Sequence, residues 1–91
     1  MKLTSIPKPI EGFQTQTLDG EIVLFHPTST TIIHINQTGA LVWGLCDRSR
    51  TVGEIVKLLG AAYPEAREEI AVDVPQAIRM LVEQGALEVI E

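Results

Sequence analysis

Apolar and polar residues alternate in the first third of the chain, as they do in half-exposed β-strands. Residues 13–18 alternate in this way and predict one strand, and residues 21–25 predict a second. Asp19-Gly20 stands between them and predicts a tight hairpin, because both central positions of a type I′ turn require positive φ. Such a two-residue turn fixes the register of the strands, which places Thr17 opposite Ile22 and Thr15 opposite Leu24.

A third strand is predicted over residues 30–35, after a turn at residues 26–29. Its β-branched residues are apolar on nearly both faces, which is typical of a strand that is covered on both sides. If the strands follow one another in space, however, this strand lies at the edge of the sheet unless the C-terminal segment covers it. It contains no Lys or Pro, the residues that commonly protect a sheet edge from pairing. The edge, roughly 20 Å long, is therefore predicted to accept an extended peptide or a second copy of the chain.

Apolar residues recur at helical spacing after this strand and predict helices. The first helix is expected from Gln37 to about Cys46, with Asn36 as its N-cap. The second begins at residues 51–54, which match a capping box, and ends at Tyr63-Pro64. Two apolar stripes are expected to be buried: Leu41, Val42, Leu45 and Cys46, with Trp43 beside them, in the first helix, and Ile55, Val56, Leu58, Leu59 and Ala62 in the second.

Pro75 interrupts the last helical segment, which begins near Glu65 and ends at Gly85. Either the helix kinks at this proline, or a short helix ends near Val72 and another begins near Asp73. We favour the second alternative, because proline is well placed in the first turn of a helix. Residues 86–90 could add a short final strand.

The N-terminal segment, residues 1–12, contains two prolines and a glycine and shows no periodic pattern, so we expect an extended or frayed tail. Residues 13–91 are expected to form a single domain. Three strands followed by three helices predict an α+β fold, winged-helix-like, in which a three-stranded antiparallel sheet packs beside three helices.

Composition narrows the classes of function. The chain has 91 residues, 45% of them hydrophobic, and a formal net charge of −5 from 12 acidic and 7 basic residues. The basic residues are scattered, whereas a nucleic-acid-binding surface clusters them, so nucleic acid is not an expected partner. No apolar run is long enough to cross a membrane, and residues 1–10 lack the apolar centre of a signal peptide. Together with the single cysteine, Cys46, these features predict a cytoplasmic protein.

The sequence offers little for catalysis. Cys46 has no histidine close to it along the chain and is interpreted as a small buried apolar residue. His26 and His34 lack the spacing of zinc ligands, and neither a phosphate-binding loop nor a nucleophile motif occurs. We therefore expect neither an enzyme nor a bound metal or cofactor.

The last helical segment offers a wall beside the predicted strand edge. On a helical wheel one arc forms a core stripe of Ile70, Val74, Ile78, Leu81 and Val82. An adjoining arc consists of Asp73, Ala77, Met80 and Gln84. Small Ala77 and adaptable Met80 can line a groove, although such positions are also typical of a simple boundary between core and solvent. The candidate peptide-binding site combines this arc with the main chain of Thr31, Ile32, Ile33, His34 and Ile35.

Residues 35–64, INQTGALVWGLCDRSRTVGEIVKLLGAAYP, resemble the PqqD family of precursor-peptide recognition elements. The likeness rests on four groups of residues in this order: Ile35, Asn36, Thr38 and Gly39; Trp43, Leu45, Cys46 and Asp47; Thr51, Glu54 and Ile55; and Tyr63-Pro64. The later segment EEIAVDVPQAIRMLVEQGALE is similar to the last helix of the family and its ending. The resemblance covers about residues 13–90.

This resemblance implies a non-catalytic protein that binds the leader segment of a ribosomally made precursor peptide. In the family the leader pairs with the third strand and rests against the third helix. The charge of Asp73 and its position on the helical wheel suggest that it could pair with a basic leader residue. The implied partner is a modifying enzyme, such as a radical SAM protein in pyrroloquinoline quinone (PQQ) biosynthesis or a leader peptidase of a lasso-peptide pathway. Three residues depart from the family pattern: Arg48 replaces a glycine, His34 replaces an aliphatic residue, and Pro75 interrupts the helix.

Two other functions remain open. A winged-helix regulator that binds nucleic acid would have the same fold, although its recognition helix would offer only Arg79 among acidic residues. A structural subunit could instead form a homodimer through the edge strand.

Overall fold

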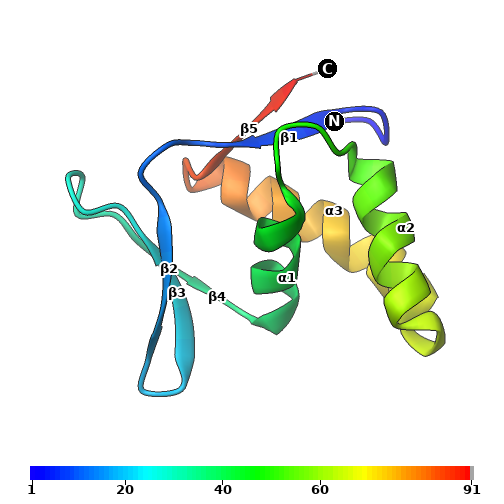
Figure 1. The fold of residues 1–91 in the computed structure, drawn as a ribbon, viewed down its shortest axis with the longest axis horizontal. Helices are drawn as coiled ribbons and strands as arrows, with labels where there is room; N and C mark the ends of the chain where they lie inside the picture. Colours follow the sequence, from blue (N-terminus) through cyan, green and yellow to red (C-terminus); the bar gives the residue numbers. More distant parts are fainter. Residues whose placement is uncertain (91) are drawn as a thin grey trace.

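The computed structural model describes residues 1–90, which form an α+β fold (Figure 1). Strands β2, β3 and β4 form an antiparallel sheet, and β1 and β5 form a separate two-stranded antiparallel sheet. The predicted class, a three-stranded antiparallel sheet followed by three helices, is confirmed. The elements in chain order are β1 (Ile6–Pro9), β2 (Gln14–Leu18), β3 (Glu21–Phe25), β4 (Ile32–Ile35), α1 (Gln37–Leu45), α2 (Val52–Ala62), the 3₁₀ turn η1 (Pro64–Ala66), α3 (Arg67–Glu83) and β5 (Leu87–Ile90).

The hairpin between β2 and β3 has the predicted turn. Asp19 has a φ of 51° and Gly20 a φ of 81°, so both central positions are left-handed, as a type I′ turn requires. The predicted register is also confirmed, because Thr17 pairs with Ile22 and Thr15 pairs with Leu24.

Residues 6–9 form strand β1, so this part of the predicted extended or frayed tail is extended and not frayed. Ile6–Pro9 pairs with β5, and just beyond the strand the N–H of Ile10 donates to the C=O of Ala86 at 2.9 Å. Hydrogen-bonded positions alternate along an antiparallel pair, so Pro7 and Pro9 turn their nitrogen atoms away from β5. The spacing of two residues therefore lets both prolines occupy one edge strand, at positions where no N–H is needed.

Side-chain caps start α1 and α2 where the sequence predicts them. The N–H of Gly39 donates to Asn36 Oδ1 at 2.7 Å. The N–H of Glu54 donates to Thr51 Oγ1 at 3.1 Å, and the N–H of Thr51 donates to Glu54 Oε1 at 2.9 Å, which completes the capping box. Tyr63 caps the C-terminus of α2 immediately before a proline, as predicted.

Helix α3 runs without interruption from Arg67 to Glu83, so the prediction of two helices separated near Val72 is wrong. Proline inside a helix costs about 3 kcal/mol relative to alanine. Tertiary packing outweighs this cost, because buried apolar residues on both sides of Pro75 hold both halves of the helix against the core. These residues are Ile70 and Val74 before the proline, and Ile78 and Leu81 after it.

The core lies between one face of the three-stranded sheet and the helices. It contains Leu24, Ile33, Ile35, Val42, Cys46, Val52, Ile55, Leu59, Ile70, Val74, Ile78, Leu81, Ala86 and Leu87. Four residues predicted for buried stripes are instead exposed: Leu41 to 38%, Leu58 to 45%, Val82 to 36%, and Ala62 at the end of α2. Within residues 1–90, each helix is too short or too polar to span a bilayer.

Candidate functional site

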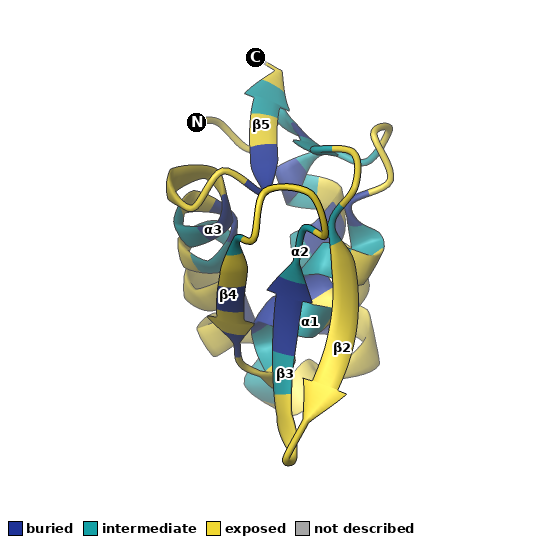
Figure 2. Cartoon of the chain, turned by 90° about the vertical axis from the view of Figure 1, so that its left-hand side faces the viewer, coloured by how far each residue is buried: buried dark blue, intermediate teal, exposed yellow. Residues whose placement is uncertain are grey.

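Strand β4 is the edge of the three-stranded sheet that lies toward α3 (Figure 2). Within the described residues it pairs with β3 alone, because the final strand, β5, pairs with β1 instead. The edge is shorter than the predicted residues 30–35, since Thr30 has a left-handed φ of 57° and β4 begins at Ile32. Only one face of β4 is covered, because Ile33 and Ile35 are buried while Ile32 and His34 are exposed.

The alternation of hydrogen bonds along β4 decides which main-chain groups are free. The N–H of His26 donates to the C=O of Thr31 at 3.1 Å, and this pair continues the β3–β4 register. Ile33 has the same parity as Thr31, so it also bonds to β3. The N–H and C=O groups of Ile32 and His34 therefore point toward the free edge. Of the strand residues predicted to pair with a peptide, these two carry the free main-chain groups.

The free edges of β1 and β2 suit an added strand less well. β1 turns the nitrogen atoms of Pro7 and Pro9 outward, and proline at an edge opposes pairing. All five residues of β2 are exposed, so a peptide there would gain main-chain bonds but little apolar contact. Of the β1, β2 and β4 edges, the β4 edge combines free main-chain groups with a helix on the other side.

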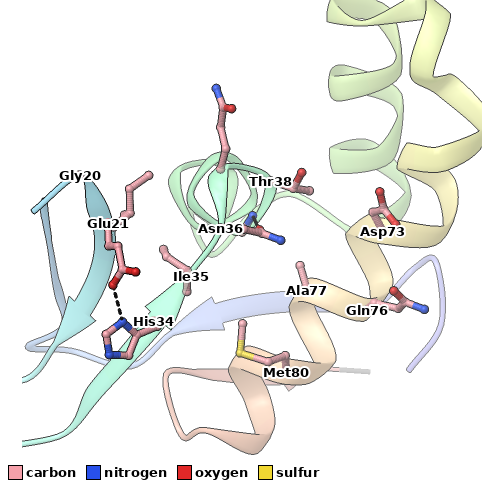
Figure 3. Close-up of a pocket in the computed structure, with 13 residues that line it drawn as sticks. Gly20, Glu21, His34, Ile35, Asn36, Thr38, Asp73, Gln76, Ala77 and Met80 are labelled. Carbon is pink, nitrogen blue, oxygen red and sulfur yellow. Dashed lines mark hydrogen bonds and ion pairs between the residues drawn. The ribbon is translucent and has the colours of Figure 1, made fainter. Parts of the chain in front are cut away.

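An open groove of about 950 Å³ separates β4 from α3 (Figure 3). Ala77 and Met80 on α3 lie across this groove from Ile35 on β4. The structure thus brings five of the predicted site residues to one groove: His34, Ile35, Asp73, Ala77 and Met80. The remaining predicted residues do not line it: Thr31, Ile32, Ile33 and Gln84.

Several residues that line the groove were not predicted. Gln76 lies on α3 one helical turn after Asp73, and the wheel could have included it. Residues 20–22 of the β2–β3 hairpin and residues 36–39 at the start of α1 also line the groove. They reach it through tertiary packing, for which the local sequence carries no signal.

Two carboxylates and one imidazole are the ionisable groups of the groove. His34 Nδ1 lies 3.5 Å from Glu21 Oε2, and both side chains are largely exposed. Asp73 lies on the α3 side of the groove, and no Lys or Arg is among the described residues that line it. The groove therefore favours a basic over an acidic ligand and suits a phosphate backbone poorly.

The described residues offer no reactive centre in this groove. Cys46 is buried in the core, and burial, with a smaller contribution from the charge of Asp47, raises the pKa of its thiol to about 12. Such a thiol stays protonated near neutral pH and is a poor nucleophile. Among residues 1–90, no three His, Cys, Asp or Glu side chains are grouped so as to hold a metal ion.

Comparison with known proteins agrees with this geometry. Residues 21–87 match the family described as coenzyme PQQ synthesis protein D (PqqD). The chain is 36% identical over 90 residues to a PqqA binding protein of Stutzerimonas stutzeri (strain A1501), which covers 97% of this chain and 95% of that protein. The structure of the present chain is similar to that of TbiB1 in complex with the TbiA(beta) leader peptide. The TM-score is 0.69, and the sequences are 26% identical, with 89% of this chain and 94% of that chain covered. The chain therefore belongs to the PqqD family.

Proposed function

We propose that this protein is a non-catalytic, cytoplasmic adaptor that binds the leader segment of a ribosomally made precursor peptide. The leader adds to β4 as a further strand and rests against α3. The observation that carries this proposal is the open edge of β4: the main-chain groups of Ile32 and His34 are free there, and His34 and Ile35 line a groove walled by Ala77 and Met80.

The adaptor acts by holding the precursor close to an enzyme that modifies it, such as a radical SAM protein or a leader peptidase. Tethering the leader raises the effective concentration of the attached core peptide at the active site of that enzyme. The relatives named above support this role, since one is called a PqqA binding protein and another was solved with a leader peptide. The acidic groove favours it over a nucleic-acid-binding function.

The test is a titration of the full chain with leader peptides encoded beside its gene, followed by backbone amide shifts and calorimetry. We expect the shifts to cluster at β4 and at α3 around Asp73–Met80. If none of the peptides shifts these residues, the proposed function is wrong.

His34→Pro tests the mode of binding, because it removes a donor that β3 does not use. We expect the variant to stay folded, since proline is tolerated at an edge position whose N–H faces solvent. Its affinity for the peptide should fall at least about tenfold, through loss of a hydrogen bond and obstruction of the edge. His34→Val is the matched control, because it removes the same side chain and keeps the N–H.

A second proline variant guards against misfolding of the first. Ile32→Pro alters the other outward position, at the first residue of β4, and should weaken binding in the same way. Retention of wild-type affinity by either folded proline variant would contradict pairing through β4.

A further inference from the structure

A second pocket, of about 240 Å³, opens where α1, α2 and α3 meet. Its apolar lining comes from Leu41 on α1, Leu59 and Tyr63 at the end of α2, and Ala66 and Ile70 at the start of α3. Leu41 and Tyr63 are 38% and 50% exposed, which is unusual for large apolar side chains gathered at one place. The size of the pocket suits one bulky side chain rather than a whole peptide segment.

This pocket adjoins the groove beside β4. Gln37, Thr38 and Asp73 line both of them, so Asp73 stands at the junction between the groove and the pocket. A chain that leaves the β4 edge along α3 reaches the pocket directly after passing Asp73.

The charge at the junction is uncompensated. Asp73 and Glu69 lie four residues apart on α3, both line the pocket, and like charges at this spacing repel each other. No Lys or Arg is among the described residues that line the pocket or the groove. A cation supplied by the ligand would relieve this repulsion, whereas an acidic ligand would increase it.

We propose that the bound leader continues past the end of β4 and anchors one bulky apolar side chain in this pocket, with a basic residue beside Asp73 and Glu69. This inference rests on the proposed function, since it assigns side-chain specificity to a peptide already held by β4. It identifies Asp73 and Leu41 as residues that determine which leaders are accepted.

The geometry of α3 predicts the spacing of the two leader residues. Ile70 and Asp73 are three residues apart, which is about 4.5 Å along the helix axis. An extended peptide advances about 3.3 Å per residue. The basic residue and the apolar anchor are therefore expected one or two positions apart in the leader.

A phage-displayed library of random 12-residue peptides, selected on the full chain, tests this spacing without knowledge of the natural leader. Enriched peptides should carry Lys or Arg within two positions of Leu, Ile or Phe. Selection on Asp73→Lys should replace the basic residue by Asp or Glu. Glu83→Lys is the matched control, because Glu83 is also exposed on α3 and lines neither cavity.

Synthetic versions of the enriched peptides then test each contact by fluorescence anisotropy. We expect Asp73→Lys to weaken binding about 5- to 10-fold, as reversal of an exposed charge pair does. Changing the apolar anchor of the peptide to alanine should weaken binding about 10- to 100-fold. Leu41→Gln should weaken it as well, whereas Leu58→Gln, at a comparably exposed leucine outside the pocket, should not.

The outcomes separate this inference from the proposed function. Peptides that bind the wild type, lose affinity for His34→Pro and bind Asp73→Lys and Leu41→Gln unchanged would overturn the inference alone. If no peptide is enriched, or if the enriched peptides bind His34→Pro as tightly as the wild type, both proposals are overturned.

Discussion

Replacing Pro75 with alanine is expected to stabilise the protein. Pro75 lies in the middle of α3, and because proline has no N–H, the C=O of Ala71 lacks its usual donor one turn later. The alanine variant restores this hydrogen bond and removes the contact between the proline ring and the preceding turn. The backbone already has a helical path here, so no new fold is required.

The expected gain combines opposing terms. Alanine is favoured over proline inside a helix by about 3 kcal/mol. The variant loses the restriction that proline imposes on the unfolded chain, about 0.4–1 kcal/mol, and part of the packing of a half-buried ring. The net increase in the free energy of unfolding is therefore about 1–2 kcal/mol, which raises Tm by about 5–15 °C for a domain of this size.

Thermal and urea unfolding, followed by far-ultraviolet circular dichroism, measure this change. Gln76→Ala is the control, because it changes the neighbouring residue with little difference in helix propensity and should shift stability by less than about 0.5 kcal/mol. A Pro75→Ala variant with an unchanged or lower Tm would refute the reasoning. It would mean that the packing of α3 against the core depends on the proline ring.

Further predictions concern the caps, the cysteine and the glycines. Thr51→Ala should lower the free energy of unfolding by about 1 kcal/mol in urea titrations, because it removes one half of the capping box. The N–H and side chain of Thr51 hold the pKa of Glu54 below its ordinary value of 4.5, so the stabilisation is complete above that pH and is lost as the pH falls below it. Urea midpoints measured down to about pH 3 should therefore decline less steeply in Glu54→Gln than in the wild type. Cys46 should resist labelling by a thiol reagent in the native protein at about pH 8 and react fully after unfolding in urea; rapid native labelling would contradict its burial. Gly20→Ala should destabilise by about 1 kcal/mol because of its left-handed φ, whereas Gly44→Ala, at an open helical position in α1, should raise Tm.

The local features of the fold could be predicted because each depends on a few neighbouring residues. Asp19-Gly20 determines its turn through the φ values that it tolerates. Asn36 and Thr51 start their helices through hydrogen bonds to N–H groups three residues away. The folded protein keeps this turn and these caps because tertiary packing does not oppose them.

The pairing of β1 with β5 could not be predicted in the same way, because the two strands come from opposite ends of the chain. Pro7 and Pro9 were interpreted as signs of an irregular tail. Their spacing is nevertheless compatible with an edge strand, since it places both nitrogen atoms on the same side. Proline marks an edge or an irregular segment equally well until the partner strand is known.

Only part of the groove could be predicted, because a helical wheel gives the direction of a residue around the helix axis but not its position along the axis. Ala77 and Met80 line the groove as predicted. Gln84 shares their direction, but it follows the end of α3, about 16 Å along the axis from Asp73. The wheel treats the segment as one continuous helix. The break predicted at Pro75 therefore placed the helix ends wrongly, but it did not change which residues share the groove-facing side.

Alternate residues of strand β4 have different roles: two pack in the core and two remain exposed. Ile33 and Ile35 bury their side chains, while Ile32 and His34 keep theirs exposed at the free edge. Substitutions at exposed positions usually change stability little, whereas those in a core are costly. If the leader pairs with β4 as proposed, related chains can therefore differ at positions 32 and 34, beside the bound peptide, at little cost in stability, whereas positions 33 and 35 must stay apolar for the chain to fold.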